Sequence, residues 1–563
     1  MRLSLGPAVP ASAPRGAATL ARLERSRDQY GAGSNADKLA LLRRLDRTLL
    51  ATAAQVRRLH EVLCFLRAYP GDARVLAQVE RMLARFERRP DLRAHRGELA
   101  SSGIAGTMFW YPYFWPTACW LARRWPSKLH FDRNDDEAGR SLAKALPLLV
   151  TPVEAAALRE LDLGGYAAID RLRARRRSDA AFLVERVAAL PGNEFTREAF
   201  YDTINPSCEL LPAADTPARG REKFGAAPLA VRSVPPRRDR PELRAEMRRP
   251  PRALRRLPRA QGEQLIELAR GAMAARGRDL DAFAYGSARD AWLVDDGDGL
   301  AFGLVGMQPA RRAPLAAIYG GLTLRNGVPI GYLQADVAGR AAALSFNTFD
   351  TFRGAEAAFT FARLLAALRH AFGVDAFSIE PYQLGKGNDE GLASGAWWFY
   401  FKLGFRPRAA AARQLARAEI ARRRTRPAHR SSVPTLRQLA AHPLFFDLDP
   451  RRRTPLPPLA DVGLRAARLL AARHDDRAAA LASVVAEAAR ALGLSSLRGL
   501  APGQRRVLEG WAPLLLLAGV TRWSQAPRRA ALELIRAKAA ASERDYALLL
   551  AAHRPLCRVL LAQ

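Results

Sequence analysis

Residues 325–407 constrain the fold of this chain more than any other stretch, because their hydrophobic spacing changes from that of strands to that of a helix and back. Asn326 and Gly327 stand between two apolar runs, residues 316–324 and 328–335. An Asn-Gly pair in that position is typical of a two-residue β-hairpin, since both turn positions need a positive φ. This stretch therefore predicts a hairpin at the start of a sheet.

The spacing of apolar residues also predicts the elements after the hairpin. Residues 341–349 predict a third antiparallel strand. In residues 357–372 the apolar side chains recur three and four positions apart, which predicts a helix that packs on the sheet and ends at Gly373. Residues 374–379 predict a buried strand, and residues 390–403 predict a second helix. The expected order is strands, a glycine-containing loop, a helix, a strand, a helix and a strand.

This order resembles the core of the GCN5-related N-acyltransferase superfamily, whose members transfer acyl groups from acyl-CoA. Residues 399–406, Phe-Tyr-Phe-Lys-Leu-Gly-Phe-Arg, look like the closing motif of that superfamily. The loop from Arg353 to Ala358 is similar to its pyrophosphate loop, with Arg353 at the first position and Ala358 at the last. Glu356 stands where the superfamily has glycine. The resemblance covers residues 263–407, about a quarter of the chain.

The resemblance implies an acyl-CoA cosubstrate and assigns roles to particular residues. Tyr400 matches the tyrosine that protonates the departing thiolate. Asp350 and Glu380, at strand ends, are the candidates for the base that deprotonates the amine. Backbone amides near the end of the third strand would polarise the thioester, and loop amides at the helix N-terminus would bind the pyrophosphate. The residues expected to bind the cofactor are Phe346, Thr348, Phe349, Arg353, Gly354, Ala355, Ala357 and Ala358.

The charge of the chain predicts an anionic partner. Lys and Arg number 89 against 55 Asp and Glu, which gives a net charge of +34. Such an excess favours binding to RNA, to an anionic membrane surface or to phosphate-bearing substrates. The alternative is an arginine-rich composition without a specific partner. The four cysteines are Cys64, Cys119, Cys208 and Cys557, and their wide spacing predicts a reducing cytoplasm with neither a disulfide framework nor a metal site.

The fold class expected is mixed α/β, with a largely antiparallel sheet, flanking helices, and mostly helical N- and C-terminal regions. We expect a helical region in 1–190, a Pro/Arg-rich linker or arm in 191–258, the acyltransferase domain in 259–410, a basic helix and linker in 411–455, and a helical domain in 456–563.

The segment 104–125 is rich in aromatic residues and has three interpretations: an aromatic core or inter-domain plug, an interfacial segment at a membrane, or a membrane span. The expected location is cytoplasmic. If the segment is interfacial, we expect the protein to bind the membrane peripherally.

Several functions are compatible with these features. The first is an N-acyltransferase that uses acyl-CoA or a related thioester or ester donor. If Glu356 abolishes CoA binding, the fold could instead serve as a non-catalytic module that binds nucleic acid or an anionic membrane. Aminoacyl-tRNA donors would suit the positive charge, and a lipid-directed acyltransferase would suit the aromatic segment.

Overall fold

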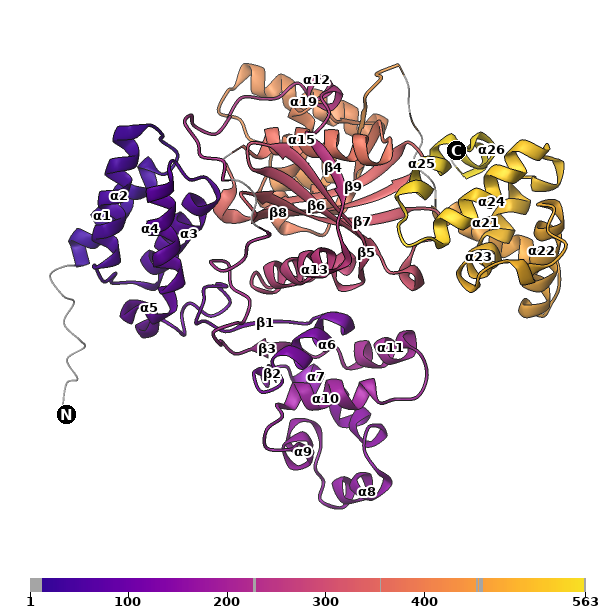
Figure 1. The fold of residues 1–563 in the computed structure, drawn as a ribbon, viewed down its shortest axis with the longest axis horizontal. Helices are drawn as coiled ribbons and strands as arrows, with labels where there is room; N and C mark the ends of the chain where they lie inside the picture. Colours follow the sequence, from indigo (N-terminus) through magenta and orange to yellow (C-terminus); the bar gives the residue numbers. More distant parts are fainter. Residues whose placement is uncertain (1–12, 226–228, 355, 452–453, 455–458, 561–563) are drawn as a thin grey trace. The chain divides into compact units, whose positions relative to one another are not determined.

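The computed structural model describes residues 13–225, 229–354, 356–451, 454 and 459–560. The fold is mixed α/β, with a large sheet and flanking helices (Figure 1). The chain divides into two compact units that alternate along the sequence. Unit 1 contains Met1–Pro236, Ile266–Tyr285 and Leu324–Ile330, and unit 2 contains Arg237–Leu265, Gly286–Thr323 and Gly331–Gln563.

Unit 1 is mostly helical and has one small sheet, in the order β1-β3-β2. Its strands are β1 (Phe109–Tyr111), β2 (Leu129–Phe131) and β3 (Cys208–Leu210). Its helices are α1 (Ala13–Ser26), α2 (Ala32–Asp46), α3 (Ala53–Ala68), α4 (Ala73–Ala84), η1 (Phe86–Arg88), α5 (Pro90–Ala94), α6 (Trp115–Arg124), α7 (Asp136–Ala145), η2 (Leu146–Leu148), α8 (Pro152–Glu160), α9 (Gly165–Leu172), α10 (Asp179–Ala188), α11 (Glu194–Ile204) and α14 (Asp281–Ala284).

The aromatic segment 104–125 forms β1 and α6. Phe109, Trp115 and Trp120 are at most 8 % exposed and belong to the hydrophobic core of unit 1, whereas Trp110 is 45 % exposed. This part of the chain therefore supplies core side chains to unit 1. Among the residues that the structure describes, no helix combines the length and the apolar character that crossing a membrane would require.

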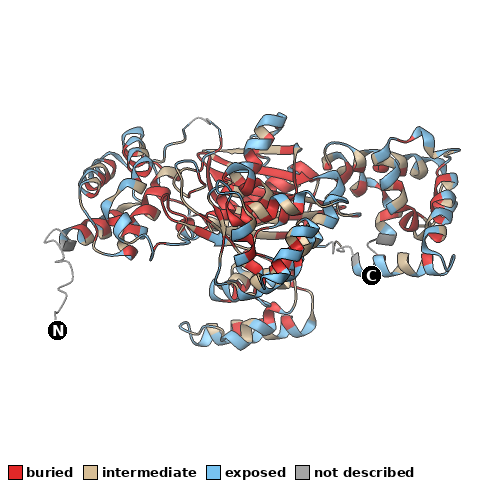
Figure 2. Ribbon diagram, turned by 90° about the horizontal axis from the view of Figure 1, so that it is seen from below, coloured by how far each residue is buried: buried red, intermediate tan, exposed pale blue. Residues whose placement is uncertain are grey.

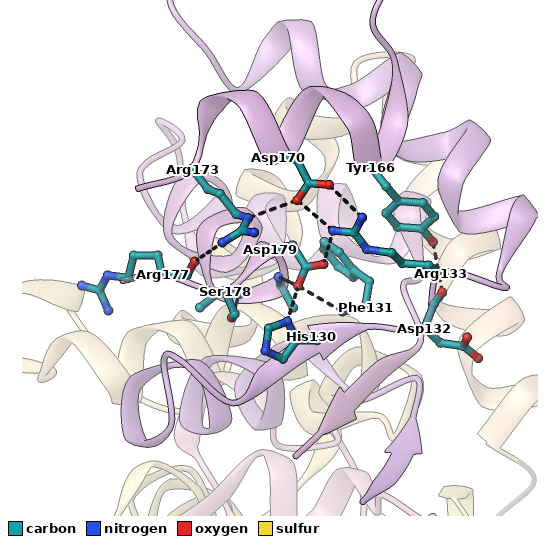
Figure 3. A network of polar contacts seen from close by, with 12 residues as sticks. His130, Phe131, Asp132, Arg133, Tyr166, Asp170, Arg173, Arg177, Ser178 and Asp179 are labelled. Carbon is teal, nitrogen blue, oxygen red and sulfur yellow. Dashed lines mark hydrogen bonds and ion pairs between the residues drawn. The ribbon is translucent and has the colours of Figure 1, made fainter. Parts of the chain in front are cut away.

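A polar network in unit 1 joins β2 to α9 and α10 (Figure 3). Asp179 is buried and accepts hydrogen bonds from Arg133 Nη2 at 3.0 Å and from the backbone N–H of Phe131 at 3.3 Å, and its carboxylate lies 3.2 Å from Nδ1 of His130. Arg133 also donates to Asp170 at 2.8 Å, and this hydrogen bond lowers the pKa of Asp170 to about 2. Since these donors satisfy the buried carboxylate, we assign the network a structural role.

Unit 2 contains a sheet of nine strands and most of the remaining helices. Its strands are β4 (Ala253–Arg256), β5 (Gly286–Gly297), β6 (Leu300–Met307), β7 (Ala317–Arg325), β8 (Val328–Ala338), β9 (Ala341–Thr348), β10 (Ala376–Ile379), β11 (Arg406–Pro407) and β12 (Leu444–Asp447), with the tip of the β7–β8 hairpin assigned to unit 1.

The helices of unit 2 before and around the sheet are α12 (Leu243–Arg248), α13 (Arg259–Ala274), whose second half belongs to unit 1, η3 (Pro309–Arg311), η4 (Asp350–Phe352), α15 (Ala357–Phe372), α16 (Pro381–Leu384), α17 (Asp389–Ala393), α18 (Ala396–Lys402), α19 (Ala410–Thr425) and α20 (Val433–Ala440). The C-terminal helices are α21 (Leu459–Ala471), α22 (Arg477–Ala491), η5 (Leu497–Gly499), α23 (Pro502–Leu517), η6 (Val520–Arg522), α24 (Gln525–Ala539), α25 (Arg544–Ala552) and α26 (Arg554–Leu560).

The large sheet has the strand order β11-β12-β10-β9-β8-β7-β6-β5-β4. The pairs β4–β5, β5–β6, β8–β9, β10–β12 and β11–β12 are antiparallel, whereas β9 and β10 are parallel. The central strands are mostly buried, and α15 lies over one face of the sheet (Figures 1 and 2). The parallel pair with its connecting helix α15 is the feature that brings two strand ends to one edge of the sheet.

The predicted hairpin is confirmed. Asn326 and Gly327 join β7 to β8 and have φ values of 50° and 77°, so both turn positions have the positive φ that the sequence pattern demands. The Asn326 side chain donates to the carbonyl oxygen of Ala68 at 3.0 Å and accepts from the backbone N–H of Ala230 at 2.9 Å. The turn residue is therefore also a polar contact of the unit 1 core.

The predicted helix at 357–372 is confirmed as α15, and Gly373 ends it in the left-handed conformation with φ 69°. The prediction of one continuous helix at 390–403 is wrong. The chain instead forms α17 and then α18, because Gly395, with φ 66°, breaks the helix and starts α18. At the end of α18 the backbone N–H of Phe405 donates to the carbonyl oxygen of Tyr400 at 3.1 Å, and Gly404 between α18 and Phe405 has φ 110°.

A buried ion pair connects α15 to β5. Arg363 is 1 % exposed, and its guanidinium group donates to Asp296 at 2.7 to 3.0 Å. The same group donates to the carbonyl oxygens of Glu246 at 2.6 Å, Arg249 at 3.1 Å and Pro250 at 3.3 Å. One side chain therefore holds α12 and the segment after it against α15 and the sheet.

We expect Arg363→Met to lower the free energy of unfolding of unit 2 by about 3–5 kcal/mol, because a buried carboxylate left without its partner is costly. The double variant Arg363→Met/Asp296→Asn should recover part of this loss. Arg369→Met, on the same helix with one hydrogen bond to Met247, is the matched control and should cost about 1 kcal/mol. Denaturant unfolding of the four proteins measures this, and equal stability of Arg363→Met and wild type would contradict it.

We expect the stability of unit 1 to fall as the pH rises from about 4 to about 7, because of Asp279. Burial raises the pKa of Asp279 from 3.8 to about 7, although the backbone N–H groups of Phe114 and Leu280 donate to its carboxylate. The folded state thus keeps a proton that the unfolded state releases near its ordinary pKa. The stabilisation is complete below that value and is lost as the pH passes the folded pKa.

The variant Asp279→Asn should remove most of this pH dependence, since its side chain does not titrate. Hydrogen exchange of residues 109–125, compared between the two proteins over the same pH range, is the measurement. The same slope in both proteins would show that another group is responsible.

Candidate functional site

The carboxyl ends of β9 and β10 form the edge at which the resemblance places the candidate catalytic residues. The two parallel strands pair from Ala341 opposite Ala376 to Leu344 opposite Ile379. Strand β9 continues to Thr348, so its last four residues extend beyond the end of β10. The backbone groups of this extension on the side of β10 are outside the β9–β10 ladder and can face a ligand.

Tyr400 lies beside this extension. Its hydroxyl group is 3.5 Å from the carbonyl oxygen of Phe346, and the side chain is 3 % exposed. Rings of Phe361 and Phe405 lie 5.4 and 5.8 Å from the Tyr400 ring and fix its position. Burial raises the pKa of Tyr400, so the hydroxyl group keeps its proton at neutral pH and can act as a donor.

The two candidate bases differ in their surroundings. Glu380 directly follows β10, is exposed, and accepts a hydrogen bond from Ser378 Oγ at 3.2 Å. Asp350 lies in η4 with its side chain 72 % exposed, and it forms an ion pair with Arg353 at 2.7 Å. Because Asp350 is held in an ion pair with Arg353, Glu380 is the carboxylate that is better placed to accept a proton.

In the loop before α15, Gly354 has a positive φ and Arg353 is already engaged by other residues. Gly354 has φ 80°, a conformation that glycine adopts without strain. Arg353 donates to the carbonyl oxygen of Thr348 at 3.2 Å and forms an ion pair with Glu390 at 2.5 Å. Ala357 is the first residue of α15, and the predicted cofactor contact at residue 355 falls outside the described residues.

Two further residues of this region have buried side chains: Phe349, which is a predicted cofactor contact, and Glu356, which stands where the superfamily has glycine. Phe349 is 6 % exposed and lies 5.9 Å from the ring of Tyr332, so only its backbone can serve a ligand. Glu356 is 3 % exposed and precedes α15. Its carboxylate therefore does not project into solvent in front of the loop.

A basic pocket of about 500 Å³ adjoins α15 and α18, and sequence reasoning did not assemble it. Ala358, the last residue of the predicted phosphate loop, is part of its lining. Among the described residues, its charged lining consists of five cations and one carboxylate: Arg238, Arg240, Lys402, Arg423, Arg430 and Asp239. Its apolar lining includes Leu392, Trp398, Phe399, Leu403 and Leu436.

The field around this pocket is positive. The pKa of Arg406, just after α18, is lowered first by burial and then by the proximity of Arg240 and Arg244. The basic residues come from three parts of the chain: the Pro/Arg-rich segment, the closing helix, and the region of the basic helix. The first of these parts is far from the other two in the sequence. Such a surface attracts phosphate-bearing ligands.

In the described parts of the chain, no three His, Cys, Asp or Glu side chains come close enough to hold a metal ion. The chain matches no family model, no curated protein and no solved structure in the searches made with it.

Proposed function

We propose that this protein is an N-acyltransferase of the GCN5-related kind, which moves an acyl group from a CoA thioester to an amine. The observation that carries the proposal is the place of the Tyr400 hydroxyl group, beside Phe346 on the part of β9 that extends beyond β10. A proton donor is thus held next to a stretch of β9 that lies outside the β9–β10 ladder, where we place the thioester.

The order of elements supports the same proposal. Consecutive strands β7 to β9 are followed by the η4 loop, α15, the parallel strand β10, the pair α17 and α18, and β11. This is the order that the resemblance implies, with α17 and α18 in place of one helix. The closing motif, residues 399–406, runs from α18 into β11.

The proposed reaction balances within these groups. The amine nitrogen attacks the carbonyl carbon, a C–N bond forms, and the C–S bond breaks. Glu380 takes the proton that the amine loses, directly or through water, and Tyr400 gives its proton to the thiolate. Backbone N–H groups at the end of β9 stabilise the negative charge that develops on the carbonyl oxygen.

The donor's phosphates would bind at the N-terminus of α15, where unpaired N–H groups and the helix dipole favour anions. For Arg353 to contribute, the phosphates must compete with Asp350 and Glu390 for its guanidinium group. The positive pocket at Ala358 adds a long-range attraction for the same part of the donor.

We expect wild-type protein to bind acetyl-CoA or a long-chain acyl-CoA, as measured by titration calorimetry. Because the loop at α15 and the pocket beside it attract phosphates, binding should weaken as salt is added. Absence of heat with either ligand at high concentration would reject the acyl-CoA proposal and favour a non-catalytic module.

We expect Tyr400→Phe to lower kcat by about 10²- to 10⁴-fold, because a placed general acid contributes a factor of that size. The ring and its packing remain, so the affinity for the donor should hardly change. Tyr382→Phe is the matched control, since Tyr382 is 60 % exposed and should tolerate the loss of its hydroxyl group. Full turnover by Tyr400→Phe would show that Tyr400 is only a core residue.

A further inference from the structure

We infer that the basic pocket is a binding site for a phosphate monoester, and that Glu419 is the positioning residue that assembles its wall. The pocket lies outside the predicted catalytic residues, and four of the five cations in its described lining come from segments outside residues 263–407, the part of the chain that the resemblance covers. The assignment of the monoester to the acyl donor rests on the proposed function.

Glu419 connects the basic helix α19 to the loop that follows it. Its side chain is 1 % exposed and accepts hydrogen bonds from Arg422 Nη1 at 2.6 Å, His429 Nε2 at 2.9 Å and Ser431 Oγ at 2.5 Å. Burial acts to raise the pKa of Glu419, but the hydrogen bonds from Ser431, His429 and Arg422 outweigh it and hold the pKa below its ordinary value. The carboxylate is therefore charged and fixes the loop.

The loop in turn fixes an aromatic wall of the pocket. Ser431 Oγ accepts a hydrogen bond from Trp398 Nε1 at 3.0 Å, and both residues line the pocket. The guanidinium group of Arg423 lies 4.4 Å from the centre of the Trp398 ring. A chain of contacts thus runs from Glu419 through Ser431 to Trp398, and the guanidinium group of Arg423 lies over the Trp398 ring.

One donor of this wall lacks a partner. Nε of Arg423 is buried and makes no hydrogen bond within the described residues. The Arg423 side chain as a whole is only half-buried, so the other N–H donors of its guanidinium group can meet an acceptor that a ligand supplies. Guanidinium groups match the geometry of phosphate oxygens and bind them through two parallel hydrogen bonds.

The balance of charge and apolar surface selects the class of ligand. Five cations against one carboxylate favour an anion with more than one charge, as a phosphate monoester has at neutral pH. Trp398, Phe399 and Leu436 give the pocket an apolar side on which an organic group attached to the phosphate can lie. A free inorganic phosphate would leave that side without a contact.

The experiment compares two donors that differ in one phosphate. Calorimetry with CoA and with 3′-dephospho-CoA measures the contribution of the monoester, and inorganic phosphate serves as the third ligand. Wild type should bind CoA at least about tenfold more tightly than 3′-dephospho-CoA, because charge-assisted hydrogen bonds to the phosphate are lost in the second ligand. In Arg423→Met this preference should fall to about twofold or less, with the affinity for 3′-dephospho-CoA unchanged.

The variant Glu419→Gln tests the positioning role. It should raise the KM for the CoA donor and leave kcat unchanged, since the wall is disturbed while Tyr400 and Glu380 are not. Arg413→Met, an exposed arginine of α19 that does not line the pocket, removes the same charge as Arg423→Met and should preserve the preference for CoA. If Glu419→Gln does not fold, Arg423→Met with its control still decides the question.

The outcomes separate this inference from the proposed function. Equal affinity of wild type for CoA and 3′-dephospho-CoA, without binding of inorganic phosphate, overturns the phosphate pocket and leaves the acyl-CoA proposal standing. Binding of inorganic phosphate that Arg423→Met abolishes, without binding of either CoA form, supports the pocket and overturns the donor. If none of the three ligands binds, both are overturned.

Discussion

The arrangement of unit 2 depends on the guanidinium group of Arg363, because it is the point at which α15, β5 and the segment after α12 meet. A buried cation of this kind is stable only if its N–H groups are satisfied, and here carboxylate and carbonyl oxygens do so. The segment held in this way follows residues 238–240, which line the basic pocket. The position of the pocket therefore depends on a contact made deep inside the fold.

A second buried cluster holds the C-terminal helices to the sheet. Asp290 of β5 accepts hydrogen bonds from Tyr319 at 3.0 Å, Ser542 at 2.6 Å and the backbone N–H of Glu543 at 2.9 Å. Glu543 in turn forms an ion pair with Lys538 at 2.5 Å, and burial raises the pKa of Glu543 and lowers that of Lys538. Glu543 also lies 3.5 Å from Nε of Arg312, so removing its carboxylate would leave two buried cations without their anionic partner, and the C-terminal helices and the sheet are coupled in stability.

The local elements near the site could be predicted from the sequence, because their signals are local. The turn at Asn326, the bounds of α15 and the end of α18 follow from residues within a few positions. The break at Gly395 was missed because the apolar pattern continues across it, and only the φ of 66° reveals it. Glycine in a helical pattern signals a break only weakly.

The assembly of the basic pocket could not be predicted, because its contacts join segments far apart in the chain. Trp398 contacts Ser431 in the pocket lining across 33 positions, and Arg363, outside the pocket, contacts Glu246 in the segment after the arm across 117. The composition of each segment shows that it is basic. A single sequence does not show that the Pro/Arg-rich arm and the basic helix come together in space. Hydrophobic periodicity and composition describe one segment at a time, so they do not show which distant segments contact each other.

The arginines that give the chain its net charge of +34 serve two different purposes. Some arginines act inside the fold: Arg312 donates to the carbonyl oxygens of Lys538 at 2.6 Å and Ala540 at 2.7 Å, where α24 ends and its carbonyl groups need partners. Such arginines replace the backbone caps that other sequences supply, and they create no binding surface. The pocket arginines differ because they converge on a hollow with a single carboxylate. Local convergence, rather than the total charge, is what makes an anion site at this place in the fold.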